Sequence, residues 1–251
     1  PSFQRPLERS QPQLVVDALH QDTRQRLADR QRHADVDAPA RRARQRLDLQ
    51  PRTIELVNDS SVNAATQSDG FTIDGSDEAN TITGSSGIDS ITAGDGDDTI
   101  NYTIGNGADV VDGGGHTIAD TLSFNGTASA NSVTMTATTL GDLTVSNVET
   151  VNVSLAGSND TMTLAALLTG ATTIKLDGGS GSGDTLNLSA LSPMGPGITL
   201  TLGSTATPVT GGAIPLAVSL TQQNFEHAIG GDGDDNFTGD VPVTWSLTGV
   251  T

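Results

Sequence analysis

Residues 75–101 are three consecutive nonapeptides that align without a gap: GSDEANTIT, GSSGIDSIT and AGDGDDTIN. In this alignment the sixth position is Asn80, Asp89 or Asp98, and the eighth position is always isoleucine. A fourth copy, GGDGDDNFT, occupies residues 230–238. A fixed short period of this kind is the signature of a repeat architecture, in which each unit stacks on its neighbours.

Looser copies keep a triplet of an acid, a hydroxyl residue and an apolar residue. Such triplets begin at Asp120, Asp160 and Asp184, and glycine-rich segments precede them. The segment GNGADVV at 105–111 is another partial copy, and it contains Asp109. The repeat therefore extends well beyond its best-preserved region.

The spacing of the glycines predicts how one repeat folds. Glycine at positions one, two and four allows the positive φ angles of a tight turn, whose carbonyl groups stay exposed. The last three positions predict a very short strand with its apolar residue inward and its neighbours outward. Two nonapeptides then form one coil of 18 residues, and the strands of successive coils pair in parallel. The turn at 75–80 is therefore expected to lie on the turn at 93–98.

Stacked turns of this composition predict a cation site. Main-chain carbonyl oxygens and the carboxylate of Asp98 would converge with groups from the adjacent turn. A cage made only of oxygen suits a hard cation with six to eight ligands, which is Ca²⁺ rather than Zn²⁺. After residue 52 the chain has 23 acidic residues and Lys175 as its only basic residue, so a compact fold needs a neutralising ion.

These nonapeptides resemble the G-G-x-G-x-D-x-U-x repeat of the RTX, or haemolysin-type calcium-binding, family. The resemblance is strong over 75–101, weaker over 105–123, and complete at 230–238. It implies an all-β fold, a parallel β-roll or β-solenoid, with calcium bound in the turns. It also implies type I secretion from a Gram-negative bacterium. The calcium-binding residues implied by this match are Asn80, Gly87, Asp89, Gly94, Asp95, Gly96, Asp97, Asp98, Gly107, Asp109, Gly231, Asp232, Gly233, Asp234 and Asp235.

The composition divides the chain into four segments. Residues 1–52 contain eleven arginines and no glycine, which is typical of a disordered leader; a helix over 12–47 and a spurious translation are the alternatives. Residues 53–126 are the expected β-roll. Residues 127–225 are rich in threonine and alternate polar and apolar residues, which predicts longer rungs of the same solenoid or an inserted β-sandwich. Residues 226–251 are an isolated repeat and a truncated strand.

The charge and the motifs exclude several functions. A net charge of −18 argues against nucleic acid and anionic membranes as partners, because both are polyanions. No apolar run approaches the roughly 20 residues of a membrane-spanning helix, and there is no cysteine. Neither the HExxH nor the G-x-S-x-G motif is present, so we expect no enzyme. His116 is interpreted as structural or solvated, and Glu226, beside His227, as facing solvent or a calcium turn.

Three functions remain open. The first is a calcium-binding structural or adhesive segment of a secreted or cell-surface protein, which folds when it meets calcium outside the cell. The second is the C-terminal secretion and folding module of an extracellular enzyme. The third is a calcium-dependent carbohydrate-binding module with glycan or cell-surface ligands. The few aromatic residues, seven in the whole chain, favour the first over the third.

Overall fold

The computed structural model describes residues 52–191, 198–215, 217–231, 234–239 and 244–246. The chain divides into two compact units, residues 1–50 and 51–251, and the described residues all belong to the second. The predictions for the leader therefore lie outside the described residues, except that Arg52 is the first residue of a strand. The described residues contain no helix that is both long and apolar enough to cross a bilayer.

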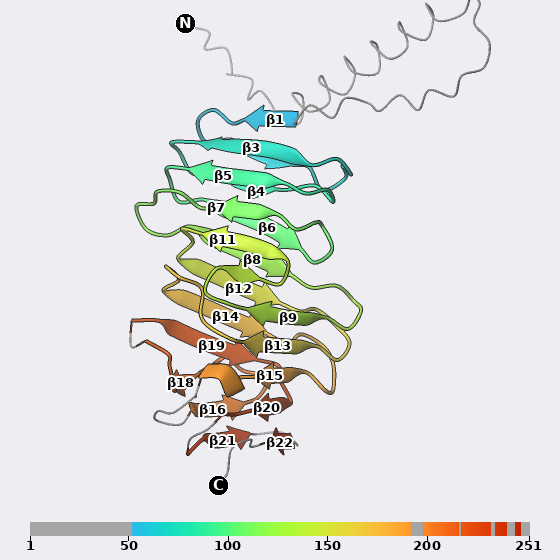
Figure 1. Cartoon of the computed structure of the whole chain (residues 1–251), viewed down its shortest axis with the longest axis vertical. Coiled ribbons are helices and arrows are strands. Elements are labelled where there is room, and N and C mark those ends of the chain that lie inside the picture. The colour runs from blue at the N-terminus through green and yellow to red at the C-terminus, as the bar shows by residue number, and fades with distance from the viewer. Residues whose placement is uncertain (1–51, 192–197, 216, 232–233, 240–243, 247–251) are drawn as a thin grey trace, which may run out of the picture. The chain divides into compact units, whose positions relative to one another are not determined.

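Most of the described strands belong to two long sheets, and they lie one above another along the long axis of the unit (Figure 1). The 11-stranded sheet contains, in spatial order, β1 (Arg52–Glu55), β3 (Phe71–Ser76), β5 (Ser90–Gly94), β7 (Val110–Asp112), β11 (Leu143–Ser146), β10 (Thr139–Leu140), β9 (Ser132–Met135), β13 (Thr161–Leu164), β15 (Thr185–Asn187), β20 (His227–Ile229) and β22 (Thr244–Ser246).

The second long sheet has eight strands. In spatial order these are β17 (Thr207–Pro208), β19 (Ser219–Gln223), β14 (Thr173–Asp177), β12 (Thr150–Ser154), β8 (Thr121–Asn125), β6 (Thr99–Thr103), β4 (Thr81–Thr83) and β2 (Ser61–Asn63). A three-stranded sheet contains β18 (Thr210–Gly211), β16 (Ile198–Leu202) and β21 (Asn236–Gly239), and a short 3₁₀ helix covers Ser189–Leu191. The predictions of an all-β fold and of parallel strand pairing are thus confirmed.

Strand pairing follows the repeat. Ile73 is aligned with Ile91 in one long sheet, and Ile82 with Ile100 in the other, each pair 18 residues apart. These side chains point inward and are at most 3% exposed. The 18-residue coil predicted from two nonapeptides is therefore present in this region. After each strand the chain turns, forms a strand of the opposite sheet, and returns to pair in parallel with the first strand. This alternation gives the chain its coiled path.

The core lies between the two long sheets and is almost entirely aliphatic. It contains one inward residue from nearly every strand triplet, continuous from Val62 to Ala228. Tyr102 and Phe124 stack within it at a ring-centroid distance of 5.3 Å. The Tyr102 hydroxyl donates a hydrogen bond to the carbonyl of Gly107 at 2.7 Å, which satisfies its polar end.

The coils lengthen from 18 residues between β4 and β6 to 22 between β6 and β8 and to 29 between β8 and β12. Strands β9, β10 and β11 form an antiparallel meander inside the 11-stranded sheet, with Leu140 aligned with both Met135 and Leu143. Beyond the meander the parallel pairing resumes, because β9 pairs with β13 and β12 pairs with β8 and β14. The strands of residues 127–225 therefore join the same two long sheets, and β16 and β18 form the smaller sheet with β21.

Candidate functional site

Side-chain oxygens connect successive coils where the chain enters the strands of the eight-stranded sheet. The main-chain N–H of Asn80 donates to Oδ1 of Asp98 at 2.6 Å, and that of Asp98 donates to Oδ1 of Asp120 at 2.8 Å. The N–H of Asp120 in turn donates to Oε2 of Glu149 at 3.0 Å. We call these four residues ladder 1, because each carboxylate accepts a hydrogen bond from the equivalent residue one coil earlier.

A second ladder with the same order of residues precedes strands of the 11-stranded sheet. The main-chain N–H of Asn131 donates to Oδ1 of Asp160 at 2.6 Å, and that of Asp160 donates to Oδ1 of Asp184 at 2.7 Å. The N–H of Asp184 donates to Oε2 of Glu226 at 2.9 Å. This ladder 2 repeats the order Asn–Asp–Asp–Glu of ladder 1, although the residues are 24 to 42 positions apart.

Shorter versions of the same arrangement occur elsewhere. Asp89 accepts the N–H of Phe71 at 2.7 Å, and Asp109 accepts the N–H of Asp89 at 2.8 Å. Asp235, from the isolated nonapeptide, accepts the N–H of Ile198 at 2.8 Å. The sixth position of the repeat therefore has one structural role in every described copy that carries an acid there, which is to bind the main chain of the preceding coil.

The two aspartates in the middle of each ladder have a second oxygen without a hydrogen-bond partner. The Oδ2 atoms concerned are buried, and they belong to Asp98, Asp120, Asp160 and Asp184. Asp89 differs, because its Oδ2 accepts a hydrogen bond from the main-chain N–H of Ser85 at 2.6 Å. A buried charged oxygen without a partner is costly, so these four atoms are the candidate ligands for a cation.

Glycine makes room for these carboxylates. A Cβ atom at Gly113 would lie 3.0 Å from Oδ2 of Asp120 and 1.9 Å from the carbonyl oxygen of Asn147. A Cβ atom at Gly181 would lie 2.9 Å from both carboxylate oxygens of Asp184. The turns thus bring main-chain and carboxylate oxygens close to one another at places where no side chain fits. Oxygen ligands from carboxylates and carbonyl groups are those that Ca²⁺ prefers.

Burial controls the protonation of the ladder carboxylates. Desolvation raises the pKa of Asp120 and of Asp109 to about 6, with repulsion from neighbouring acids as a smaller cause. Desolvation also raises the pKa of Asp98 and Asp184. The main-chain N–H donors oppose this effect only in part. Burial without a nearby cation therefore disfavours the ionised form of these groups.

The glycines predicted from the repeat lie in the turns that join the two long sheets or, in the case of Gly94, at the end of a strand that enters such a turn. Gly94, Gly96 and Gly107 have φ angles of 106°, 126° and 107°, a region that favours glycine. Gly87 is required for a different reason, because its Cβ would lie 2.5 Å from the main-chain nitrogen of Gly70. The Gly94 carbonyl accepts the N–H of Gly115 at 2.9 Å, which holds two turns together.

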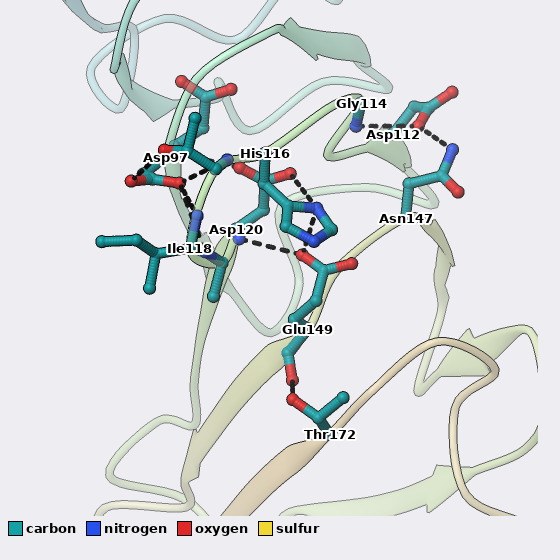
Figure 2. Close-up of polar contacts among 12 residues, drawn as sticks. Asp97, Asp112, Gly114, His116, Ile118, Asp120, Asn147, Glu149 and Thr172 are labelled. Atoms are coloured by element: carbon teal, nitrogen blue, oxygen red, sulfur yellow. Dashed lines mark hydrogen bonds and ion pairs between the residues drawn. The ribbon is translucent and has the colours of Figure 1, made fainter.

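The acids at the variable positions of the repeat take no part in the hydrogen bonds of the ladders. Asp95 and Asp234 are exposed. The carboxylate of Asp97 accepts the N–H groups of Thr117 and Ile118 at 3.0 and 2.7 Å, which lowers its pKa (Figure 2). Asp97 thus binds a loop of the next coil. Gly231 is buried beside Asp235, whose Oδ2 accepts its N–H at 3.1 Å, whereas Asp232 and Gly233 lie outside the described residues.

Sequence reasoning missed much of the ladders. The triplets beginning at Asp120, Asp160 and Asp184 are visible in the sequence, but these residues were not among the expected calcium ligands. Glu149 and Glu226 were not among the expected calcium ligands either. Glu149 is also followed by a hydroxyl residue and an apolar residue. The triplet of an acid, a hydroxyl residue and an apolar residue could therefore have identified it as a ladder residue. Unequal coil lengths hid it, because the spacing of the ladder partners varies from 18 to 42 residues.

Comparison of the sequence with protein-family models and with curated proteins gives no match, and comparison of the structure with solved structures gives none either. The geometry of the ladders and turns therefore carries the functional argument.

Proposed function

We propose that this chain binds calcium ions at the carboxylate ladders and serves as a structural or adhesive segment of a secreted protein. The observation that carries the proposal is the set of four buried Oδ2 atoms without hydrogen-bond partners, at equivalent places in two ladders. The role is not catalytic. Calcium neutralises the ladder aspartates, and the resemblance of the nonapeptides to RTX repeats supports the same ion.

Electrostatics supports a bound cation along the stack. Coils in a parallel sheet are about 4.8 Å apart, so ladder carboxylates repeat at short intervals. Within the described residues the permanently charged cations are Arg52 and Lys175. Arg52 forms an ion pair with Asp69 at 2.9 Å, remote in sequence from both ladders. A divalent ion compensates two carboxylates at once, and an oxygen-only environment selects Ca²⁺ over softer metals.

The proposal also supports folding outside the cell. A ligand that binds only the folded form stabilises it by RT ln(1 + [L]/Kd). At millimolar calcium and a Kd of roughly 10⁻⁴ M, each site contributes about 1.4 kcal/mol. At the submicromolar calcium of a cytoplasm the same site contributes almost nothing. Several such sites make stability depend on the compartment, as an exported protein requires.

The test is a calcium titration of the chelator-treated full chain. Circular dichroism and the thermal midpoint are followed as calcium is added, with magnesium at equal concentration as the control for ionic strength. We expect calcium to increase the β signal and to raise the midpoint, and magnesium to do so much less. A β spectrum and a midpoint that are the same in chelator and in calcium would contradict the proposal.

A cavity with a mixed polar and apolar lining favours one further candidate, carbohydrate binding. The cavity has a volume of about 280 Å³ and lies over strands β8, β12, β14 and β19, with Asn152, Lys175 and Gln223 among its lining residues. Amide, hydroxyl and amine groups of this kind hydrogen-bond sugar hydroxyls. A glycan array probed with and without calcium tests it. Binding that K175A and Q223A weaken supports the candidate, and an array without binding rejects it.

A further inference from the structure

One histidine, in the loop between β7 and β8, lies close to carboxylates of two successive coils. Nδ1 of His116 is 3.0 Å from Oε2 of Glu149 and 3.9 Å from Oδ2 of Asp120 (Figure 2). The three ligand atoms all lie within 4.8 Å of one another. Asp120 and Glu149 belong to ladder 1, whereas His116 belongs to the loop that leads into it. No equivalent histidine is part of ladder 2.

The position of His116 is fixed by an enlarged turn. Asp95 is aligned with Gly115, and Thr99 with Thr121, so this turn is two residues longer than the one before it. Asp97 holds the additional residues, because its carboxylate accepts three main-chain N–H groups and the hydroxyl of Thr117. The insertion that carries the imidazole is therefore anchored to the preceding coil.

Glu149 is held from both sides. Its Oε2 accepts the N–H of Asp120 at 3.0 Å, and its main-chain carbonyl accepts the N–H groups of Thr172 and Thr173 at 2.9 and 3.0 Å. The Glu149 side chain is only 12% exposed. Its carboxylate is thus set in place by the two neighbouring coils before any ligand binds.

A separate observation indicates a ligand at this position. Oδ2 of Asp120 has no hydrogen-bond partner, its side chain is fully buried, and it faces the imidazole. The His116 side chain is 34% exposed, so an ion can enter from solvent. The cluster therefore combines a buried, unsatisfied carboxylate oxygen with an open access route.

We propose that His116, Asp120 and Glu149 form a site for a divalent transition metal, for which Zn²⁺ is the probe. Imidazole nitrogen together with carboxylate oxygen is a ligand set that zinc accepts and calcium does not favour. Metal–ligand bonds of about 2.0–2.1 Å place tetrahedral ligands about 3.3 Å apart. The observed separations of 3.0 and 3.9 Å bracket that value. Water or another group completes the coordination.

The experiment uses the full chain in calcium-free and in calcium-saturated buffer, because the Asp120 carboxylate is a ligand in both proposals. Zinc binding in calcium-free buffer decides the present proposal. His20 and His33 lie outside the described residues, and an H20A/H33A background removes their imidazoles. Zinc chloride is titrated into this background by calorimetry. We expect one zinc ion per chain, and we expect H116A to weaken its binding by about tenfold or more.

The matched control is H227A, which removes the other described histidine, on β20. We expect H227A to leave zinc affinity unchanged. E149Q keeps an acceptor for the Asp120 N–H but removes the charge, and it should weaken zinc while the circular dichroism spectrum in calcium stays the same. Cobalt provides a second readout, through d–d absorption that H116A abolishes. No zinc binding by the background, or equal binding by the background and H116A, would overturn the proposal.

Discussion

Asp98 and Asp160 occupy equivalent places in two separate ladders. Each carboxylate accepts the main-chain N–H of an asparagine at 2.6 Å, and each has a buried second oxygen without a hydrogen-bond partner. The two places are equivalent although the coils differ in length. Asp98 is 18 residues after its asparagine, whereas Asp160 is 29 residues after its own. Asp160 has one further donor, Nδ2 of Asn131 at 2.9 Å, but the buried oxygen left for an ion is equivalent in both residues.

The first prediction compares these two residues. D98N and D160N should each reduce the calcium-induced rise in the thermal midpoint, and by similar amounts, because each removes one ligand charge. Loss of one site with a Kd of roughly 10⁻⁴ M removes about 1.4 kcal/mol at millimolar calcium. D77N, at an exposed turn position, is the control and should keep the wild-type response. Unequal effects of D98N and D160N would mean that the ladders bind calcium differently.

The second prediction concerns pH in the presence of chelator. Burial raises the pKa of Asp109 and Asp120 to about 6, above the value of about 3.9 for an exposed aspartate. The folded chain therefore holds protons between about pH 4 and 6 that the unfolded chain releases. The contribution of these two groups to the urea midpoint should be largest near pH 4 and should fall as the pH rises to about 6.

Other titratable groups lie around Asp109 and Asp120, so a control variant is needed for this pH dependence. Asp89 faces Asp109, while Asp98, Glu149 and His116 face Asp120. D109N/D120N should flatten the profile, because the replaced groups no longer titrate. Stability in chelator that increases from pH 5 to pH 7 would contradict the raised pKa values.

The third prediction tests the glycines that make room for the ladder carboxylates. G113A places a Cβ atom 1.9 Å from the main-chain oxygen of Asn147 and 3.0 Å from Oδ2 of Asp120, so backbone has to move. We expect a loss of about 1–3 kcal/mol or more in urea unfolding at saturating calcium. G157A is the control, because its nearest neighbour would be Oγ of Ser180 at 3.4 Å, and it should change stability by about 0.5 kcal/mol or less.

The fourth prediction concerns the loop that carries His116. D97A removes the acceptor of the Thr117, Ile118 and Ala119 N–H groups, so their amide hydrogen exchange should become faster. D95A, in the same turn but exposed, should leave those three rates unchanged. If D97A exchanges like the wild type, Asp97 does not hold the loop. The measurement is residue-resolved hydrogen exchange by NMR in calcium.

The repeat in the sequence was enough to predict part of this fold. Ile82 and Ile100 occupy the same repeat position, and their alignment in adjacent coils follows from a period of nine. The inward direction of these side chains also follows, since the period of a strand is two. Sequence reasoning could go this far because local turn chemistry and apolar alternation act over fewer than twenty residues.

The longer coils could not be predicted in the same way. Val151 is aligned with Leu122 and Ile174, across 29 and 23 residues, and nothing in the local sequence sets those distances. Insertions such as the meander around Leu140 change the spacing while the ladder contact is kept. For the same reason no sequence pattern linked His116 with Glu149, which is 33 residues away. Their contact is apparent only in the three-dimensional structure.

The direction of the hydrogen bonds between coils has a mechanical consequence. In both long sheets these bonds run from one coil to the next, along the stack rather than across it. Tension applied to the two ends of the described stack therefore loads them in series, and the outermost coil can detach while the rest stays intact. An ion bound by carboxylates of two neighbouring coils would link these coils and oppose their separation. Resistance to stretching would then be set by the calcium concentration of the surroundings.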